Sequence, residues 1–541
     1  MNTVHTPLRW QGESYPGTAP NDVYGALADL ERPCFVVRTE RGVGAVSGGR
    51  VSRGADGWPL LAGVPALPPS QLGAAAFRAH HGVRYAYHAG AMAGGIASAE
   101  MVIALARSGF LASYGAAGQL PETIEAALLR FRDEIPGLPY AVNLIHSPHE
   151  ERLEREAVEL FLRHRVPCVE ASAFLRLTPH VVRYRVSGFG RDERGLPRAG
   201  NRLIAKVSRP EIAELFLRPA PADMVAELLA GGLISREQAE LAPSLPMADD
   251  ITAEADSGGH TDRRPLMALL PTVLRVRDKV QGELGYARPV RVGAAGGLGT
   301  PRACAAAFVL GAAYVVTGSV NQSCLEAGTS RTAKEMLADA GIADCEMAPA
   351  ADMFEMGVEL QVLKKGTLFP LRAKRLYQLY QTYDGLEALP EAERARLETQ
   401  ILRRPLEEVW EDCRTYFQRR DPDQLRRAAG SPKRRMALVF RWYLGMASRW
   451  AVTGEESRSP DYQIWCGPAM GDFNDWATGS YLKHPRNRRV ADVAHHLMAG
   501  AAFHTRLEDL ARAGARMPTT ASDYRPAPLR PHDNAYARGV L

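Results

Sequence analysis

Apolar and polar positions follow two alternating patterns between residues 85 and 330. Short, β-branched apolar runs end in Gly, Ser or Asn, and amphipathic or Ala-rich runs follow them. The first pattern is typical of buried strands and the second of helices that pack on one face. About eight such units, roughly 25 to 45 residues apart over ~250 residues, predict an α/β fold with a (β/α)8 TIM barrel. The predicted strands are Tyr85–Ala89, Leu111–Tyr114, Tyr140–Ile145, Pro167–Ala171, Arg202–Val207, Asp250–Glu254, Val290–Val292 and Ala313–Thr317.

Several of the connecting helices have clear starting signals. Thr300 precedes Pro301, which suits an N-cap followed by the first helical position, and the Ala-rich stretch Arg302–Leu310 continues the helix. Apolar residues at 3.6-residue spacing predict two more helices, at Ala97–Arg107 and Glu122–Arg132.

Two interruptions lengthen the barrel. The turn-rich stretch Gly188–Gly200, between the runs Val181–Arg185 and Arg202–Val207, predicts a β-hairpin. The stretch Ala222–Leu241 predicts a helical hairpin, because a Gly-Gly pair separates two helix-forming runs. We therefore expect an insertion at about residues 208–248.

The chain outside the barrel differs in composition at its two ends. Residues 1–83 are rich in Gly and Pro, with one predicted strand pair around Cys34–Val46, whereas residues 346–541 are mostly helix-forming. We expect three parts: an N-terminal segment with short strands (1–83), the barrel (84–345) and a helical C-terminal cap or substrate region (346–541).

Composition narrows the class of protein. The chain has 541 residues, of which 46% are hydrophobic and 23% charged, a balance that excludes disorder and small disulfide-stapled scaffolds. The 66 basic and 61 acidic residues give a formal net charge of +5, too balanced for a dedicated nucleic-acid binder.

The expected compartment follows from cysteines and apolar runs. The seven cysteines are scattered without a CxxC pair, which favours reduced thiols. The first ten residues show no apolar core of a secretory signal, and the longest apolar run, Ala303–Val316, is too short to cross a bilayer. We expect a cytoplasmic protein without a membrane span.

Small residues follow the last two predicted strands. Gly296 and Gly297 precede a helix, and Gly318 and Ser319 follow one βα unit later. These are the two adjacent loops in which barrel phosphate sites form, so the pattern predicts a phosphate-bearing ligand. The alternative is that these glycines only make tight turns.

Three polar residues are candidates for chemistry at the same end of the barrel. His260 follows two glycines among polar neighbours, and imidazole titrates near neutral pH, so it is a candidate proton donor; alternatively it only fixes its loop. Lys206 is the lone charge in an apolar strand and either faces an anionic or electron-rich ligand or forms a structural ion pair. Asn143 offers a donor and an acceptor to a flat heterocycle.

Other catalytic motifs are absent from the sequence. It contains no GxSxG elbow, no P-loop and no zinc-ligand spacing, and no Rossmann fingerprint follows a strand. The loop at His260 has no cysteine, which a purine-nucleotide dehydrogenase would need. We predict no metal site.

Seven segments together resemble one family. They are YHAGAMAGGIASAEMVIALARSGFLASYGAAG, VNLIHSP, IAKVSRPEIAELF, DDITAEADSGGHTDRRP, VRVGAAGGLGTPRACAAAFVLGAAYVVTGSVNQ, MAPAADMFEMGVELQVLKKGTLF and DYQIWCGPAMGDFNDW. They resemble the PfaD-like trans-acting enoyl reductases of bacterial polyunsaturated fatty acid and trans-acyltransferase polyketide synthases. That family lies within the larger group of nitronate monooxygenase-like FMN barrels.

The resemblance implies FMN at the barrel mouth, with its phosphate on Gly296, Gly297, Gly318 and Ser319. It places Ala91 and Met92 by the isoalloxazine ring and Asn143 and Lys206 at its polar edge. It also matches Gly259 and His260 to a Gly-Gly-His signature near the reacting face, with His260 either delivering a proton or orienting substrate.

The implied reaction is reduction of the α,β-double bond of enoyl thioesters on an acyl carrier protein, with transiently bound NADPH or NADH as hydride donor. Two rival functions stay open: a nitronate monooxygenase, and a non-catalytic flavin-binding subunit of a megasynthase. The C-terminal basic clusters, such as Arg426-Arg427, either steer an acidic carrier protein or form a solvated helical face. Met347, Met353 and Met356 either line an acyl channel or pack in the core. The oligomeric state, a homodimer included, is open.

Overall fold

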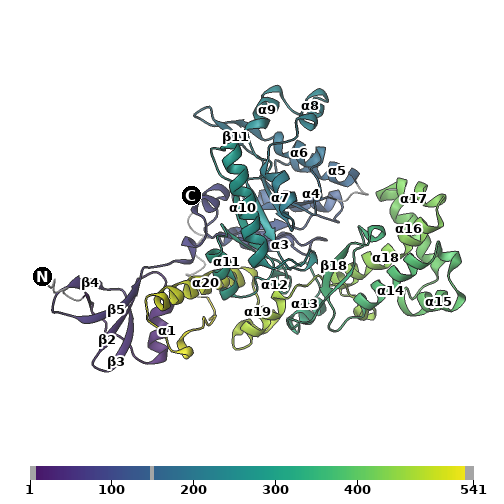
Figure 1. Ribbon diagram of the computed structural model, residues 1–541. Coiled ribbons are helices and arrows are strands. Elements are labelled where there is room, and N and C mark those ends of the chain that lie inside the picture. Colours follow the sequence, from purple (N-terminus) through teal and green to yellow (C-terminus); the bar gives the residue numbers. More distant parts are fainter. Residues whose placement is uncertain (1–7, 147–150, 530–541) are drawn as a thin grey trace.

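The centre of the molecule is a closed barrel of eight parallel strands, in the order β12-β13-β15-β16-β6-β7-β8-β9 (Figure 1). The computed structural model describes residues 8–146 and 151–529 of the chain. The barrel confirms the (β/α)8 prediction, and each of its strands overlaps a predicted one. Their bounds are β6 Tyr87–Ala89, β7 Leu111–Tyr114, β8 Ala141–Ile145, β9 Cys168–Ser172, β12 Arg202–Val207, β13 Asp250–Glu254, β15 Arg291–Ala295 and β16 Val315–Thr317.

The helices around the barrel begin where the sequence signals them. Thr300 accepts a hydrogen bond from the amide of Ala303 and Pro301 takes the first position of α11 (Pro301–Val309), while Ser98 caps α3 (Ala99–Arg107). The remaining barrel helices are α4 Pro121–Glu134, α5 Glu151–Arg163, α6 Pro179–Val186, α7 Pro210–Leu217, α10 Leu266–Leu284, α12 Ser319–Gln322 and α13 Arg331–Ala338.

Both predicted interruptions are present. Strands β10 (Phe189–Arg191) and β11 (Pro197–Ala199) pair antiparallel as the hairpin. The run Val181–Arg185 before it lies in helix α6, because Thr178 caps that helix through the amide of Val181. Helices α8 (Ala222–Ala230) and α9 (Arg236–Leu241) form the helical hairpin.

The N-terminal segment forms a five-stranded sheet at one end of the molecule, in the order β3-β2-β5-β1-β4 (Figure 1). Its elements are β1 Leu8–Gln11, α1 Pro20–Ala28, β2 Cys34–Thr39, β3 Gly42–Ser47, β4 Arg50–Arg53 and β5 Trp58–Val64. The predicted strand pair is β2 and β3. Arg506, buried on α20 (Val490–Arg512), donates to the carbonyl oxygens of Leu27, Asp29 and Arg32 and so ties this segment to the C-terminal region.

The C-terminal region is mostly helical, as predicted, but it packs in two separate places. One group of helices forms a lobe beside the barrel, whereas α19 (Ala469–Ala477) and α20 return to it (Figure 1). Gly500 on α20 lies so close to α11 that a Cβ there would be 2.6 Å from Pro301. The lobe helices are α14 Phe369–Thr382, α15 Glu391–Arg396, α16 Leu406–Arg420, α17 Pro422–Ala429 and α18 Pro432–Thr453.

A small sheet joins this region to the barrel. Strand β14 (Gly259–His260), in the loop after β13, pairs with β18 (Glu359–Leu363), which pairs with β17 (Cys345–Pro349). No local sequence pattern indicates the pairing of β14 with β18, because β14 lies about a hundred residues before β18 in the chain and has only two residues.

Helix α2 (Ala75–His81) closes the amino-terminal end of the barrel. His81 Nε2 lies 2.8 Å from Asp250 Oδ2, and Arg291 contacts both oxygens of the same carboxylate. The ring of Phe77 stacks on that of Tyr314 with centroids 4.2 Å apart. This end is therefore a packed plug of aromatic rings and paired charges.

The barrel interior changes from apolar to polar along its axis. Side chains two residues apart on a strand point to the same face. One apolar layer contains Ala86, Leu111, Ala141, Cys168 and Ile204. Two residues further along the same strands come His88, Ser113, Asn143, Glu170 and Lys206. The polar layer lies at the carboxyl end, where barrel enzymes hold their active sites.

All seven cysteines are free thiols. Among the described residues, no helix combines the length and apolar character that crossing a membrane requires.

Candidate functional site

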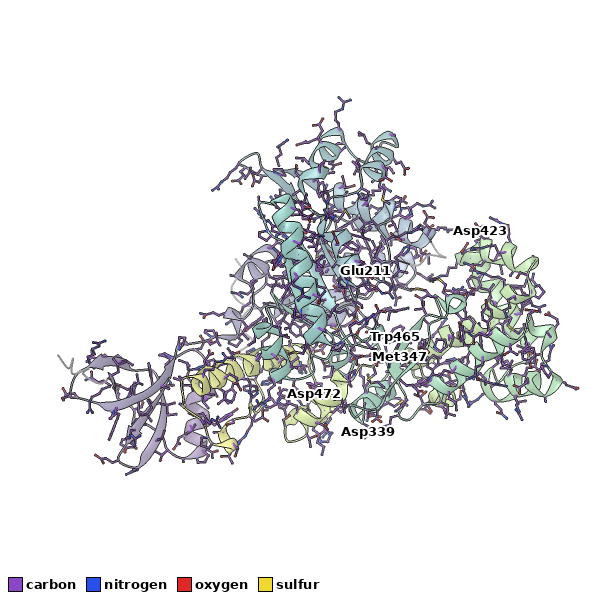
Figure 2. The ribbon with its side chains drawn as sticks, viewed as in Figure 1. Glu211, Asp339, Met347, Asp423, Trp465 and Asp472 are labelled. Carbon is purple, nitrogen blue, oxygen red and sulfur yellow. The ribbon has the colours of Figure 1, made fainter. Side chains whose placement is uncertain are left out.

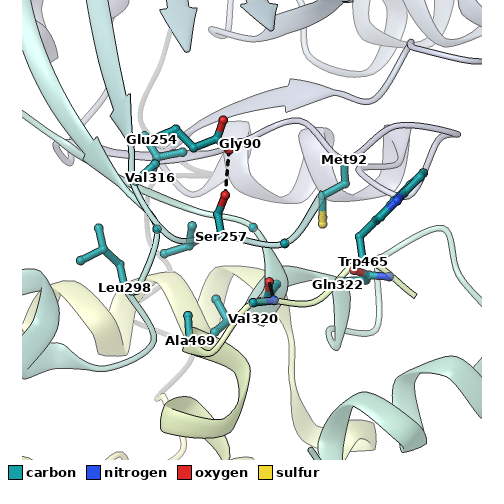
Figure 3. Close-up of a pocket in the computed structure, with 18 of the residues that line it drawn as sticks. Gly90, Met92, Glu254, Ser257, Leu298, Val316, Val320, Gln322, Trp465 and Ala469 are labelled. Carbon is teal, nitrogen blue, oxygen red and sulfur yellow. Dashed lines mark hydrogen bonds between the residues drawn. The ribbon is translucent and has the colours of Figure 1, made fainter. Parts of the chain in front are cut away.

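A cavity lies at the carboxyl end of the barrel, between the barrel loops and the C-terminal region (Figure 3). Its open volume is about 630 Å³, including the solvent at its mouth, which is the size of a cofactor site. Seven of the predicted site residues line it: Ala91, Met92, Lys206, Gly296, Gly297, Gly318 and Ser319. The sequence therefore predicted the location of the cavity, while the roles of these residues stay predictions.

The two phosphate-site loops leave room in the cavity. A Cβ added at Gly297 or at Gly318 would meet no atom within 4 Å, so both positions open onto free space. Gly296 has a φ of +85°, and its Cβ would lie 2.6 Å from the backbone of Ala255, so this position requires glycine. Ser319 Oγ accepts a hydrogen bond from the amide of Gly467 at 3.0 Å, which joins the second of these loops to the C-terminal region.

These residues fit a flavin mononucleotide. Glycine backbone and a hydroxyl can hold a phosphate, and the apolar side chains of Met92, Leu298 and Val320 can hold a flat ring. Lys206 adds one positive charge in the wall.

Lys206 forms ion pairs and also lines the cavity, so both interpretations of this residue have support. Its Nζ lies 3.2 Å from Glu254 Oε1 and 3.7 Å from Glu170 Oε1. Burial lowers the pKa of Lys206, but the two carboxylates outweigh burial and raise it. Ser257 Oγ in turn donates to Glu254, as the dashed line in Figure 3 shows. The side chain is thus a fixed cation.

His260 lies at the rim and does not line the cavity, although Ser257 and Gly258 in its loop do. Its Nε2 is 3.1 Å from Asp352 Oδ1, and the strand pairing of β14 with β18 holds its backbone. Burial lowers the pKa of His260, but the Asp352 carboxylate outweighs burial and raises it. Gly259 before it has a φ of +82°, which sets the turn of the loop. The contact with Asp352 thus favours the protonated form of His260, which can donate a proton.

Asn143 lies in the polar layer below the cavity and does not line it. Its Nδ2 donates to the carbonyl oxygen of Glu170 and to Ser172 Oγ, both at 3.1 Å. Asn143 therefore supports strand β9, and its contact with a cofactor stays a prediction.

The outer wall comes from the C-terminal region, which was predicted as a cap or substrate region but from which no individual site residue was predicted. Trp465, Gly467 and Ala469 line the cavity, and Figure 2 shows Trp465 and Met347 between the barrel and the helical lobe. A Cβ at Gly258 would lie 2.9 Å from the backbone nitrogen of Cys466, so two chain segments about 200 residues apart touch through glycine. The glycines at 258 and 467 were the one signal in the sequence for this contact.

Several arginines of the lobe form ion pairs with acidic side chains of the same region. Arg404 contacts Glu408 and Asp412, and Arg426 and Arg435 also have acidic partners. These pairs favour a solvated helical face.

The predicted methionine channel does not form part of the cavity wall. Met353 is buried, whereas Met356 is exposed, and neither these two nor Met347 lines the cavity. The packing interpretation therefore suits Met353.

Comparisons with known protein families match two parts of the chain. Residues 10–66 match the family described as the fatty acid synthase subunit PfaD N-terminal domain. Residues 383–462 match the inserted helical domain of [acyl-carrier-protein] S-malonyltransferase.

Individual relatives match most of the chain. It is 48% identical to a polyunsaturated fatty acid synthase polypeptide of Thraustochytrium sp. over 446 residues, 81% of this chain and 30% of that protein. It is 44% identical to polyketide biosynthesis protein PksE of Bacillus subtilis over 447 residues, 82% of this chain and 58% of that protein. The chain thus spans less than two thirds of the length of these relatives.

A solved structure matches more completely. The enoyl reductase domain of MlnA, from the macrolactin biosynthesis cluster of Bacillus amyloliquefaciens, is 39% identical with a TM-score of 0.77. The match covers 82% of this chain and 100% of that domain.

Proposed function

The chain belongs to the PfaD-like family of trans-acting enoyl reductases, and on that premise we propose that it reduces the α,β-double bond of enoyl thioesters. The substrates would be carried on an acyl carrier protein during polyunsaturated fatty acid or polyketide biosynthesis. The observation that carries the proposal is the cavity at the barrel mouth, where a small-residue cradle, the Lys206 cation and the nearby His260–Asp352 pair occur together.

FMN would be held with its phosphate on Gly296, Gly297, Gly318 and Ser319 and its ring beside Met92. Bound there, it would supply hydride transfer from NADPH or NADH to the β-carbon of the substrate. The protein would supply position and electrostatics.

The chain's own residues handle the proton and the access of water. His260 would donate a proton to the α-carbon, and the Asp352 carboxylate raises the pKa of His260 and so favours the protonated imidazole that this step needs. Trp465 and Gly467 form part of the outer wall and would limit the access of water to the reacting centre.

One observation supports an acyl carrier protein as the partner of this chain. The lobe segment 383–462 resembles a domain inserted in a transferase that is named for acyl carrier protein, and this lobe lies beside the barrel (Figure 1). The paired arginines of the lobe add little to this support.

The test is a flavin spectrum followed by an assay. The purified protein should bind FMN, and it should oxidise NADPH in the presence of a crotonyl thioester on carrier protein. Oxygen consumption with an alkyl nitronate, without enoyl reduction, would instead identify a monooxygenase. A flavin-loaded protein that is inert on every enoyl carrier substrate would favour a non-catalytic subunit.

A further inference from the structure

Glu170 occupies a place in the barrel that the reaction above does not use. It is the central residue of β9, and its side chain is only 1% exposed. A buried carboxylate is costly unless its neighbours compensate its charge, so its contacts indicate what it does.

Its first oxygen holds a loop. Oε2 accepts the amide proton of Ala91 at 3.0 Å, in the loop that follows β6 and lines the cavity. His88 Nε2 lies 3.5 Å from the same oxygen and donates to or accepts from Ser113 at 2.8 Å. Burial lowers the pKa of His88 to about 4, so this ring is neutral at pH 7.

Its second oxygen faces the cavity side. Oε1 lies 3.7 Å from Lys206 Nζ and accepts no hydrogen bond from the described residues. A Cβ on Gly90, which lines the cavity, would come within 3.9 Å of this oxygen. The oxygen therefore lies close behind a residue of the cavity wall.

The charges around Lys206 do not cancel. Glu170 and Glu254 flank one ammonium group, and the neutral His88 adds no charge. Burial raises the pKa of Glu170, but the Lys206 cation and the hydrogen bond from Ala91 contribute to lowering it, so the carboxylate stays ionised. In a buried site, removing one of these charges changes the local field more than it would in water.

We propose that Glu170 is a positioning residue, which fixes the Ala91 amide at the cavity wall and sets how much positive charge Lys206 presents to a bound flavin ring. The part that concerns the ring rests on the proposed function. The part that concerns the loop does not.

Three variants separate the two effects. Glu170→Gln keeps an oxygen for the Ala91 amide but removes the charge, and Glu170→Leu removes both. Glu254→Gln is the matched control, because it removes a charge beside Lys206 and leaves the bond to Ala91 intact.

The first measurement is amide hydrogen exchange at Ala91 in protein without flavin. Exchange should stay slow in Glu170→Gln and Glu254→Gln, and it should speed up at least tenfold in Glu170→Leu. Unchanged exchange in Glu170→Leu would overturn the positioning of the loop.

The second measurement is the midpoint potential of bound FMN. Removing a negative charge beside Lys206 favours the reduced, more negative flavin, so Glu170→Gln and Glu254→Gln should both raise the potential. A tenfold change in the ratio of reduced to oxidised flavin corresponds to about 30 mV for two electrons. An unchanged potential in Glu170→Gln would overturn the electrostatic part. A wild-type protein that binds no FMN would contradict the proposed function, and amide exchange alone would then decide the role of Glu170.

Discussion

The barrel holds a buried carboxylate near each end, and the two are held differently. At the closed end, both oxygens of Asp250 have close partners: Arg291 at 2.6 and 2.8 Å and His81 at 2.8 Å. At the mouth, the contacts of Glu170 range from 3.0 to 3.7 Å, and Oε1 accepts no hydrogen bond from the part of the chain that the structure describes.

The difference in pairing suggests that the carboxylate at the closed end stabilises the fold, whereas the one at the mouth serves the binding cavity. Burial raises the pKa of Asp250, but Arg291 and His81 outweigh it and lower the pKa to about 2, as expected for a carboxylate with close partners on both oxygens. At the mouth, Lys206 and Glu254 line the cavity, so the same kind of buried charge remains available to a ligand. The carboxylate with both oxygens paired lies at the closed end of the barrel, whereas the carboxylate with one oxygen free of hydrogen bonds from the described residues lies beside the binding cavity.

The largest effect is expected from breaking the ion pair of Asp250 at the closed end of the barrel. Arg291→Met leaves Asp250 buried without its main partner and should lower the unfolding free energy by about 3–5 kcal/mol in urea. Arg191→Met, which removes an exposed arginine of the hairpin, is the control and should change it by less than about 0.5 kcal/mol. If Arg291→Met does not fold, Arg291→Lys provides a milder measurement. Wild-type stability in both Arg291 variants would contradict a structural role for this end.

The next largest effect concerns His260, the proposed proton donor at the barrel mouth. His260→Ala should lower kcat about 100-fold or more while FMN binding stays unchanged, because the loss falls on proton transfer. His180→Ala, which removes a histidine–carboxylate pair on α6 away from the cavity, is the matched control and should keep full activity. Full activity of His260→Ala would remove His260 from the mechanism.

A smaller effect is expected from a substitution in the proposed phosphate site, which is formed by Gly296, Gly297, Gly318 and Ser319. Gly318 has a negative φ of −131°, so Gly318→Ala requires no left-handed backbone, and its Cβ enters open space in the cavity. FMN affinity, measured by fluorescence titration, should fall about tenfold or more, which is about 1.4 kcal/mol, with the melting temperature unchanged. Gly190→Ala in the hairpin is the control, since its Cβ also meets open space. Equal FMN affinity in both variants would place the phosphate elsewhere.

The smallest effect is the pH dependence of the His260–Asp352 pair. The raised pKa of His260 stabilises the fold below about pH 6.5, and this contribution is lost as pH rises through the raised pKa. Burial raises the pKa of Asp352, but His260 outweighs burial and lowers it, so the Asp352 contribution is present above about pH 4 and lost as pH falls.

Asp352→Asn should therefore cost up to about 1 kcal/mol between about pH 4 and 6.5, and less at pH 9. The alkaline limb of kcat/KM should also move to lower pH, because His260 loses the carboxylate that raises its pKa. A pH profile of Asp352→Asn that matches the wild type would show that the pair is not coupled.

The sequence predicted the barrel well because its strands and helices are signalled locally. The Thr300–Pro301 start of α11 and the glycines at 296, 297 and 318 are readable from neighbouring residues. Glu170 was not recognised, because nothing in its strand shows that Ala91 and Lys206 lie beside it. Trp465 and the β14–β18 pairing were missed for the same reason: they depend on contacts between distant segments.

The most direct test of the proposed cofactor site is an experimental structure of the chain loaded with FMN. We predict the phosphate within hydrogen-bond distance of the loops at Gly296–Gly297 and Gly318–Ser319, with the ring beside Ala91 and Lys206. A flavin bound outside this cavity, or one whose phosphate touches neither loop, would contradict this prediction.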